Sequence, residues 1–81
     1  MPKPELLLFG SVVRKYRKAA GMSQEDLADR AEIHRTYIGG IERGERNPTL
    51  VMIHRLAKAL DMAPSKLLES DPVKTGRRNA L

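Results

Sequence analysis

Residues 24–43, QEDLADRAEIHRTYIGGIER, decide the fold of this chain of 81 residues. Their spacing predicts two short helices separated by a turn of three or four residues. Ser23 stands where its hydroxyl can accept from free backbone N–H groups at the start of the first helix, with Asp26 as its capping-box partner. The second helix is expected to begin near Arg35 and to end at Gly44, because glycine readily adopts the left-handed conformation that terminates helices.

The second of these helices divides its surface between two kinds of residue. At about 100° per residue, Ile38 and Ile41 point to one side. Gly39 and Gly40 are on the opposite side. Two adjacent glycines inside a helix cost about 1 kcal/mol each relative to alanine, which suggests that something bulky approaches the helix backbone at these positions. A nucleic acid is one such group, and the alternative is a weak helix whose polar face is only solvated. The opposite side carries Arg35, Thr36, Gly39, Gly40 and Arg43.

Composition limits the classes to which the protein can belong. The length suits one domain. Fifteen lysines and arginines against ten acidic residues give a net charge of +5, which favours a polyanionic partner. The absence of cysteine excludes disulfides and thiolate metal sites. No run approaches the ~20 apolar residues of a membrane span, and none suits a signal peptide, so we expect a cytoplasmic protein without a membrane partner.

Three further helices are predicted outside the central stretch, and no strand pattern is present. They cover about residues 5–20, 49–60 and 64–69. All connections are short. The sequence therefore predicts an all-α fold, a compact five-helix domain over residues 5–69, followed by a flexible basic C-terminal tail over residues 70–81.

Apolar periodicity defines the faces that these helices bury. Thr49 is the expected N-cap of the fourth helix. Val51 and Met52 fall off the apolar stripe of that helix, and two adjacent exposed apolar residues suggest a contact surface. The expected core positions are Phe9, Val13, Tyr16 and Ala20 in the first helix, Leu50, Ile53, Leu56, Ala57 and Leu60 in the fourth, and Leu67 and Leu68 in the fifth.

The stretch SQEDLADRAEIHRTYIGGIERGERNPTL, residues 23–50, resembles the helix-turn-helix signature of the lambda-repressor-like (XRE, or Cro/C1-type) DNA-binding domains. The likeness continues through VVRKYRKAAG, IHRLAKAL and SKLL, and so covers about residues 6–69. The segment HRTYIGGIERGERNP is most similar to the small controller proteins of restriction–modification systems. That resemblance implies a homodimeric regulator of transcription.

The resemblance also implies a role for individual residues. Arg35 and Thr36 would reach base edges in the major groove, where arginine can donate two hydrogen bonds to guanine and the threonine methyl can contact thymine. Gln24 would bind a phosphate and brace the recognition helix. An ion pair between Arg17 and Glu42 would join the first helix to the recognition helix. Contacts to phosphates, which fix register rather than sequence, are implied for Tyr37, Arg43, Arg46 and Asn47.

Structural roles remain alternatives for several of these residues. Tyr37 lies close enough to the apolar face to be a partly buried core residue. The hydroxyl of Thr36 can instead serve the helix N-terminus, and Arg43 can neutralise the helix C-terminus. Arg46 and Asn47 fit an ordinary turn, since asparagine before proline is common in turns.

The chain departs from the family pattern at two places. Glu32 stands in the turn where glycine is common, so the turn is either strained or adjusted. Gly39 and Gly40 lack the side chains that many relatives use to read bases. Direct readout is therefore expected to concentrate on Arg35 and Thr36, with the remaining specificity coming from DNA shape.

Together these features predict a sequence-specific regulator that binds a palindromic double-stranded DNA operator as a homodimer, with RNA polymerase as a candidate further partner. As a controller protein it would act on its own promoter and on a linked endonuclease gene. The dimer surface is expected on the fourth and fifth helices, with Val51, Met52 and Arg55 as candidates.

Two other functions stay open. One is an antitoxin-type or phage-type repressor of the same superfamily. The other is a helical protein-interaction module that no longer binds DNA, which the arginines at positions 35, 43 and 46 disfavour. RNA binding is disfavoured, because this sequence lacks the aromatic stacking platform that RNA-binding modules generally use.

Enzymatic activity is not expected, because no nucleophile, base and orienting group can be assembled from this sequence. His34 and His54 have no cysteine or carboxylate cluster at ligand spacing. We therefore expect no metal and no cofactor.

Overall fold

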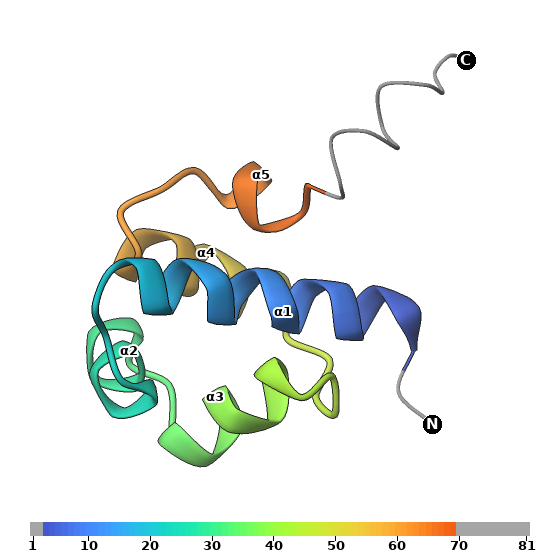
Figure 1. Cartoon of the computed structure of the whole chain (residues 1–81), viewed down its shortest axis with the longest axis horizontal. Helices are drawn as coiled ribbons and strands as arrows, with labels where there is room; N and C mark the ends of the chain where they lie inside the picture. Colours follow the sequence, from blue (N-terminus) through green and yellow to red (C-terminus); the bar gives the residue numbers. More distant parts are fainter. Residues whose placement is uncertain (1–2, 70–81) are drawn as a thin grey trace.

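The computed structural model describes residues 3–69, and within that range it contains helices and no strand. The all-α, five-helix prediction is confirmed (Figure 1). The predicted C-terminal tail, residues 70–81, lies outside the described residues. The helices are α1 (Pro4–Ala19), α2 (Gln24–Ala31), α3 (Arg35–Glu42), α4 (Leu50–Ala59) and α5 (Pro64–Leu67).

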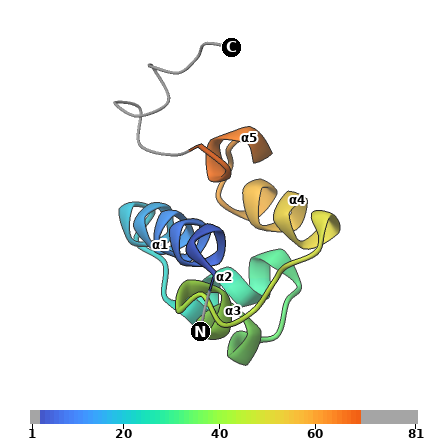
Figure 2. The same cartoon turned by 90° about the vertical axis from the view of Figure 1, so that its right-hand side faces the viewer.

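The helices pack in a closed ring of contacts. α1 packs on α3, α3 on α2, α2 on α4, α4 on α5, and α5 returns to α1. In Figure 2, α2 and α3 lie below the pair formed by α1 and α4, and α5 lies above that pair. None of the described helices is long and apolar enough to cross a membrane. This arrangement leaves one side of α3 free of any other helix, which matters for the site.

Every helix sends at least one fully buried aliphatic side chain into a common core. Such a core is expected from a sequence with only three aromatic residues. Burying one large aliphatic side chain stabilises the fold by about 1.5–3 kcal/mol relative to exposure. The core therefore joins all the helices rather than one pair. Its largest members are Val13 of α1, Leu27 of α2, Ile38 and Ile41 of α3, Leu56 of α4 and Leu67 of α5.

The predicted helix ends are present. The Ser23 hydroxyl accepts from the Asp26 N–H (2.9 Å) while the Asp26 carboxylate accepts from the Ser23 N–H (3.0 Å), which completes the capping box. Thr49 caps α4 by accepting from the Met52 N–H at 3.2 Å. Gly44, the residue predicted to end α3, follows the C-cap residue Arg43 and adopts a left-handed conformation (φ +76°). Side-chain chemistry at these positions therefore sets where the helices start and stop.

Gly10 permits a close approach of α1 to α3 that the sequence did not reveal. A Cβ added to this residue would lie 2.8 Å from the Glu42 carbonyl oxygen and closer still to that of Ile41. Both obstacles are backbone atoms, which cannot rotate away. The missing side chain at position 10 is therefore what lets α1 lie against the end of α3.

The predicted apolar stripe of α4 was wrong at two positions. Leu50, a predicted core residue, is 67% exposed, whereas Met52, predicted to lie outside the core, packs against it. At about 100° per residue, Met52 is one turn before Leu56 and shares its face, while Leu50 is about 120° away. Val51 is exposed as predicted.

Two other expected core positions are exposed. Ala20 follows the end of α1 and lies at the surface. Leu68 is the C-cap residue of α5 and is 59% exposed. Leu67 alone anchors α5 in the core.

Candidate nucleic-acid interface

The N-terminal end of α3 is open to solvent and carries Arg35 and Thr36. The residue that caps this end is His34, whose Nδ1 accepts from the Thr36 N–H at 3.1 Å. The sequence prediction gave His34 no such role and allowed the Thr36 hydroxyl to serve the helix start. Histidine is outside the usual set of capping residues, so no sequence signal pointed to it. With His34 as the cap, the Thr36 side chain has no role in closing the helix.

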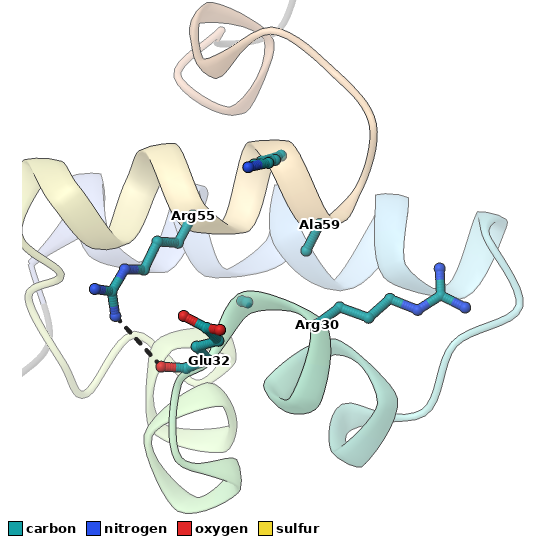
Figure 3. Close-up of a pocket in the computed structure, with 6 residues that line it drawn as sticks. Arg30, Glu32, Arg55 and Ala59 are labelled. Atoms are coloured by element: carbon teal, nitrogen blue, oxygen red, sulfur yellow. Dashed lines mark hydrogen bonds between the residues drawn. The ribbon is translucent and has the colours of Figure 1, made fainter.

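The turn between α2 and α3 keeps its left-handed residue although that residue is not glycine. Glu32 has φ 59° and ψ 44° at the C-cap of α2. The turn is therefore strained rather than adjusted, since a side chain in this conformation costs about 1–2 kcal/mol. Arg55 of α4 reaches this turn and donates through Nη1 to the Glu32 carbonyl at 3.4 Å (Figure 3).

A shallow pocket beside this turn has a basic lining without forming a focused anion site. It is lined by residues of α2, the turn and α4. Figure 3 shows the guanidinium of Arg30 pointing away from that of Arg55, with Glu32 between them. The charges therefore diverge around a carboxylate. The full lining is Arg30, Ala31, Glu32, Arg55, Lys58 and Ala59.

A buried ion pair anchors the other end of α3. Arg17 of α1 donates through Nε to Glu42 Oε2 (2.6 Å) and through Nη2 to Oε1 (3.1 Å), and the two side chains are only 9% and 3% exposed. Arg17 Nη1 also donates to the Met22 carbonyl at 2.8 Å. The hydrogen bond with Glu42 raises the pKa of Arg17 above its ordinary value. The pair that the family resemblance implied is thus present in the fold.

Gln24 joins the same network from the start of α2. Its Nε2 donates to Glu42 Oε1 at 3.0 Å, so one carboxylate oxygen receives bonds from α1 and α2 together. Gln24 therefore braces α3 as the resemblance implied. A hydrogen bond to each oxygen satisfies a buried carboxylate that would otherwise destabilise the fold.

The two glycines of α3 are covered by this chain's own side chains. The sequence predicts that a bulky group approaches the backbone at these glycines, with DNA as one possibility. In the structure both are buried, Gly39 beneath Arg43 and Gly40 beneath Arg46. The bulky groups are therefore two arginines of the same chain.

Tyr37 combines a core position with a polar contact. Its ring packs against the hydrophobic core, and its hydroxyl donates to the Asn47 carbonyl at 3.4 Å. The Arg46 guanidinium carbon lies 5.2 Å from the ring centroid.

Arg43, the C-cap residue of α3, forms an exposed ion pair with Glu45, with Nε 3.1 Å from Oε1. An exposed pair of this kind stabilises the fold by only about 0–1 kcal/mol, so Arg43 can leave Glu45 for another anion at little cost.

The family follows from a match over most of this domain. The helix-turn-helix family model matches residues 13–67, which span all of α2, α3 and α4. The chain belongs to the helix-turn-helix family. It is of the lambda-repressor-like (XRE) type, and it is a DNA-binding regulator of transcription rather than an enzyme.

Among the relatives of this helix-turn-helix chain, control protein C.BamHI of Bacillus amyloliquefaciens is 50% identical over 64 residues, which are 78% of this chain and 79% of the relative. The crystal structure of the restriction-modification controller protein C.AhdI from Aeromonas hydrophila is similar with a TM-score of 0.79 and 48% identity, covering 80% of this chain and 98% of that one. The structure of SinR, a master regulator for biofilm formation, in complex with DNA has a TM-score of 0.72 and 31% identity, covering 75% and 98%.

In this helix-turn-helix domain the implied DNA-contacting residues lie on α3 and the loop after it, except Gln24, which begins α2 and bonds to Glu42. The residues offered for a dimer surface are elsewhere, on α4, where Val51 is 60% exposed and Met52 is half-buried. Within residues 3–69 no group of three or more histidine, cysteine or acidic side chains is arranged to hold a metal. The exposed members of the α3 surface are Arg35, Thr36, Arg43, Arg46 and Asn47, with Tyr37 half-buried among them.

Proposed function

We propose that this regulator is the controller protein of a restriction–modification system and binds a palindromic operator as a homodimer. The observation that carries the proposal is the exposed N-terminal end of α3, which presents Arg35 and Thr36 on a helix braced from two sides at Glu42. A rigid support is what a base-reading helix requires, because its side chains must meet base edges in fixed register. The kinship with C.BamHI and C.AhdI supports the controller assignment.

Base readout is assigned to the first turn of α3. Arg35 and Thr36 are both exposed, and His34 supplies the cap, so neither side chain is needed to close the helix. A bidentate arginine–guanine pair discriminates by about 1–3 kcal/mol against a wrong base. With both glycines of α3 buried, these two residues are the ones that this helix can extend into a major groove.

Phosphate contacts are assigned to the far end of α3 and the loop after it. Arg43 and Arg46 are exposed cations, and Asn47 is an exposed amide beside them. These contacts would set register and supply the salt-dependent part of the affinity. Tyr37 supports this region through Asn47. Gln24 stands at the first turn of α2, where backbone N–H groups favour an anion, although its side chain already serves Glu42.

Dimerisation would supply both affinity and site length, since one domain of this size makes few base contacts. Two recognition helices would then lie in successive major grooves about 34 Å apart. The exposed apolar side chain of Val51 beside Leu50 on α4 supports a contact surface there. Met52 and Arg55 are the further candidates, although both also serve the chain's own fold.

The regulated genes would be the protein's own and that of a linked endonuclease, with RNA polymerase as a partner at the promoter. The protein would act in the cytoplasm, where its DNA is. A gel-shift titration against the DNA upstream of its own gene, with random DNA as competitor, tests the proposal. Saturable binding in steps of two chains that resists competitor is expected. Binding no stronger than to random DNA would contradict it and would favour a protein-interaction role.

A further inference from the structure

The loop that leaves the recognition helix folds back onto it at Gly40. The Glu45 N–H donates to the Gly40 carbonyl at 2.8 Å, and the Gly44 N–H donates to the Ile41 carbonyl at 3.0 Å. The left-handed conformation of Gly44 makes this reversal possible. The next residue in the loop, Arg46, is thereby brought alongside the helix that the chain has just left.

The stem of Arg46 occupies the space that a side chain at position 40 would fill. A Cβ built on Gly40 would lie 2.5 Å from Arg46 Cγ, 3.3 Å from Nε and 3.5 Å from Cδ. The nearest of these atoms is the Cγ, which is close to the backbone of Arg46. A methyl group at position 40 would therefore displace the whole side chain rather than bend its tip.

This path of the stem brings the Arg46 charge to Tyr37. The guanidinium carbon lies 5.2 Å from the ring centroid, within the range in which a cation is attracted to an aromatic face. Tyr37 is in turn held by its packing on the core and by its hydrogen bond to the Asn47 carbonyl. We call this arrangement of Tyr37 and Arg46 the Tyr37–Arg46 stack.

We propose that Gly40 is a positioning residue for DNA binding, because its missing side chain lets Arg46 form the Tyr37–Arg46 stack before DNA arrives. A free arginine loses rotamer freedom when it binds a phosphate, and a stacked arginine has already lost much of it. The same contact gives a physical reason for a glycine inside an eight-residue helix, where alanine favours the helix more. The phosphate role rests on the proposed function, whereas the stack belongs to the free protein.

The stack is tested first without DNA, by proton NMR of the full chain. A ring current shifts protons that lie over its face, so the Arg46 side-chain protons are expected upfield in the wild type and near their unstructured positions in Gly40→Ala. Gly39→Ala is the matched control, because its Cβ would meet only the tips of Arg43 (3.1 Å) and Gln24 (3.6 Å). It should keep the Arg46 shift. An unchanged shift in Gly40→Ala would overturn the proposal.

A second variant covers the case in which Gly40→Ala fails to fold. Removing the Arg46 stem makes room for the added methyl, so Gly40→Ala combined with Arg46→Ala should fold. Recovery of the fold in this double variant supports the assignment of Arg46 as the group that Gly40 accommodates. Failure of both variants to fold would contradict it.

DNA binding is then measured with two duplexes, one from the region upstream of the gene and one of shuffled sequence. Gly40→Ala should weaken binding to both by about two- to tenfold, the cost of ordering one long side chain. Arg46→Ala should lower the salt slope by about 1. Adding Gly40→Ala to Arg46→Ala should then change affinity no further. Additive losses would contradict positioning through Arg46. If the wild type binds neither duplex, the proposed function fails, while the NMR result still decides the role of Gly40.

Discussion

Arg17 and Glu42 meet through two hydrogen bonds, at 2.6 and 3.1 Å, and join the end of α1 to the end of α3 in a nearly dry environment. Gln24 adds a third bond to the same carboxylate. The recognition helix is therefore fastened to two other helices at one residue. Because the fastening is at the C-terminal end, the N-terminal end stays exposed to solvent, as the proposed base readout requires.

Replacing Arg17 with alanine should destabilise the fold by about 3–5 kcal/mol, since the Glu42 charge would stay buried without its partner. Urea denaturation followed by circular dichroism measures this loss. The double variant Arg17→Met with Glu42→Leu is the control, because two apolar groups of similar size leave no buried charge. It should regain most of the stability lost in Arg17→Ala, although the Met22 carbonyl and the Gln24 amide lose their side-chain partners. A loss below about 1 kcal/mol in Arg17→Ala would mean that the pair behaves like a surface pair.

Replacing Glu32 with glycine should stabilise the protein by about 1 kcal/mol, because glycine adopts the left-handed conformation without steric cost. Thermal unfolding measures the gain. Asp61→Gly is a matched comparison, since Asp61 also has a positive φ (58°). Aspartate tolerates this conformation better than glutamate, so its gain should be smaller. A less stable Glu32→Gly variant would show that the turn is not strained at this residue.

Replacing Gly10 with alanine should destabilise the fold by about 1–3 kcal/mol or more, because the new methyl group meets the backbone carbonyls of Ile41 and Glu42. In an isolated helix the same change would be favourable by about 1 kcal/mol. Chemical denaturation of the variant measures whether its free energy of unfolding falls or rises relative to the wild type. Ser11→Ala, at the neighbouring exposed position, is the control for a change to alanine without a backbone clash, and it also removes the hydrogen bond from the Ser11 hydroxyl to the Leu8 carbonyl (2.8 Å). A Gly10→Ala variant as stable as the wild type would contradict the close approach of α1 and α3.

The capping box at Ser23 predicts a pH dependence. The hydrogen bond from the Ser23 N–H holds the pKa of Asp26 below its usual value of 3.8. A lowered pKa in the folded state contributes stability above the unfolded value, and this contribution is lost as the pH falls through the folded value. The melting temperature of the wild type should thus exceed that of Asp26→Asn at neutral pH, with the gap closing below pH 3.8.

Asp29→Asn is the control for that measurement, since Asp29 is an exposed carboxylate of the same helix outside the capping box. Its difference from the wild type should not follow the same course. A gap between the wild type and Asp26→Asn that stays constant from neutral to acid pH would show that the carboxylate adds nothing to the cap.

The sequence predicted those features that depend on local chemistry. Ser23, Thr49 and Gly44 mark helix ends through their own hydrogen bonds or conformations, so their positions are readable from spacing alone. The resemblance to the helix-turn-helix family also predicted the ion pair between Arg17 and Glu42. These two residues are too far apart in the chain for helical periodicity to connect them.

Part of what the sequence did not predict depends on tertiary contacts. Gly10 and Gly40 lack side chains because other parts of the chain fill their space, and a single sequence does not say which parts meet. His34 caps α3 although histidine is an uncommon cap. The exchange of Leu50 and Met52 between surface and core had a different cause, because the helical angle from Leu56 would have placed Met52 correctly.

The most direct test of the account compares the wild type with Arg35→Ala on two duplexes, the upstream DNA and a shuffled sequence of the same composition. Binding isotherms at one fixed salt concentration give the specificity ratio for each protein. We expect Arg35→Ala to lose about 1–3 kcal/mol on the upstream DNA and far less on the shuffled duplex, because the lost contact reads a base. An equal loss on both duplexes would contradict base readout by Arg35 and with it the proposed mode of recognition.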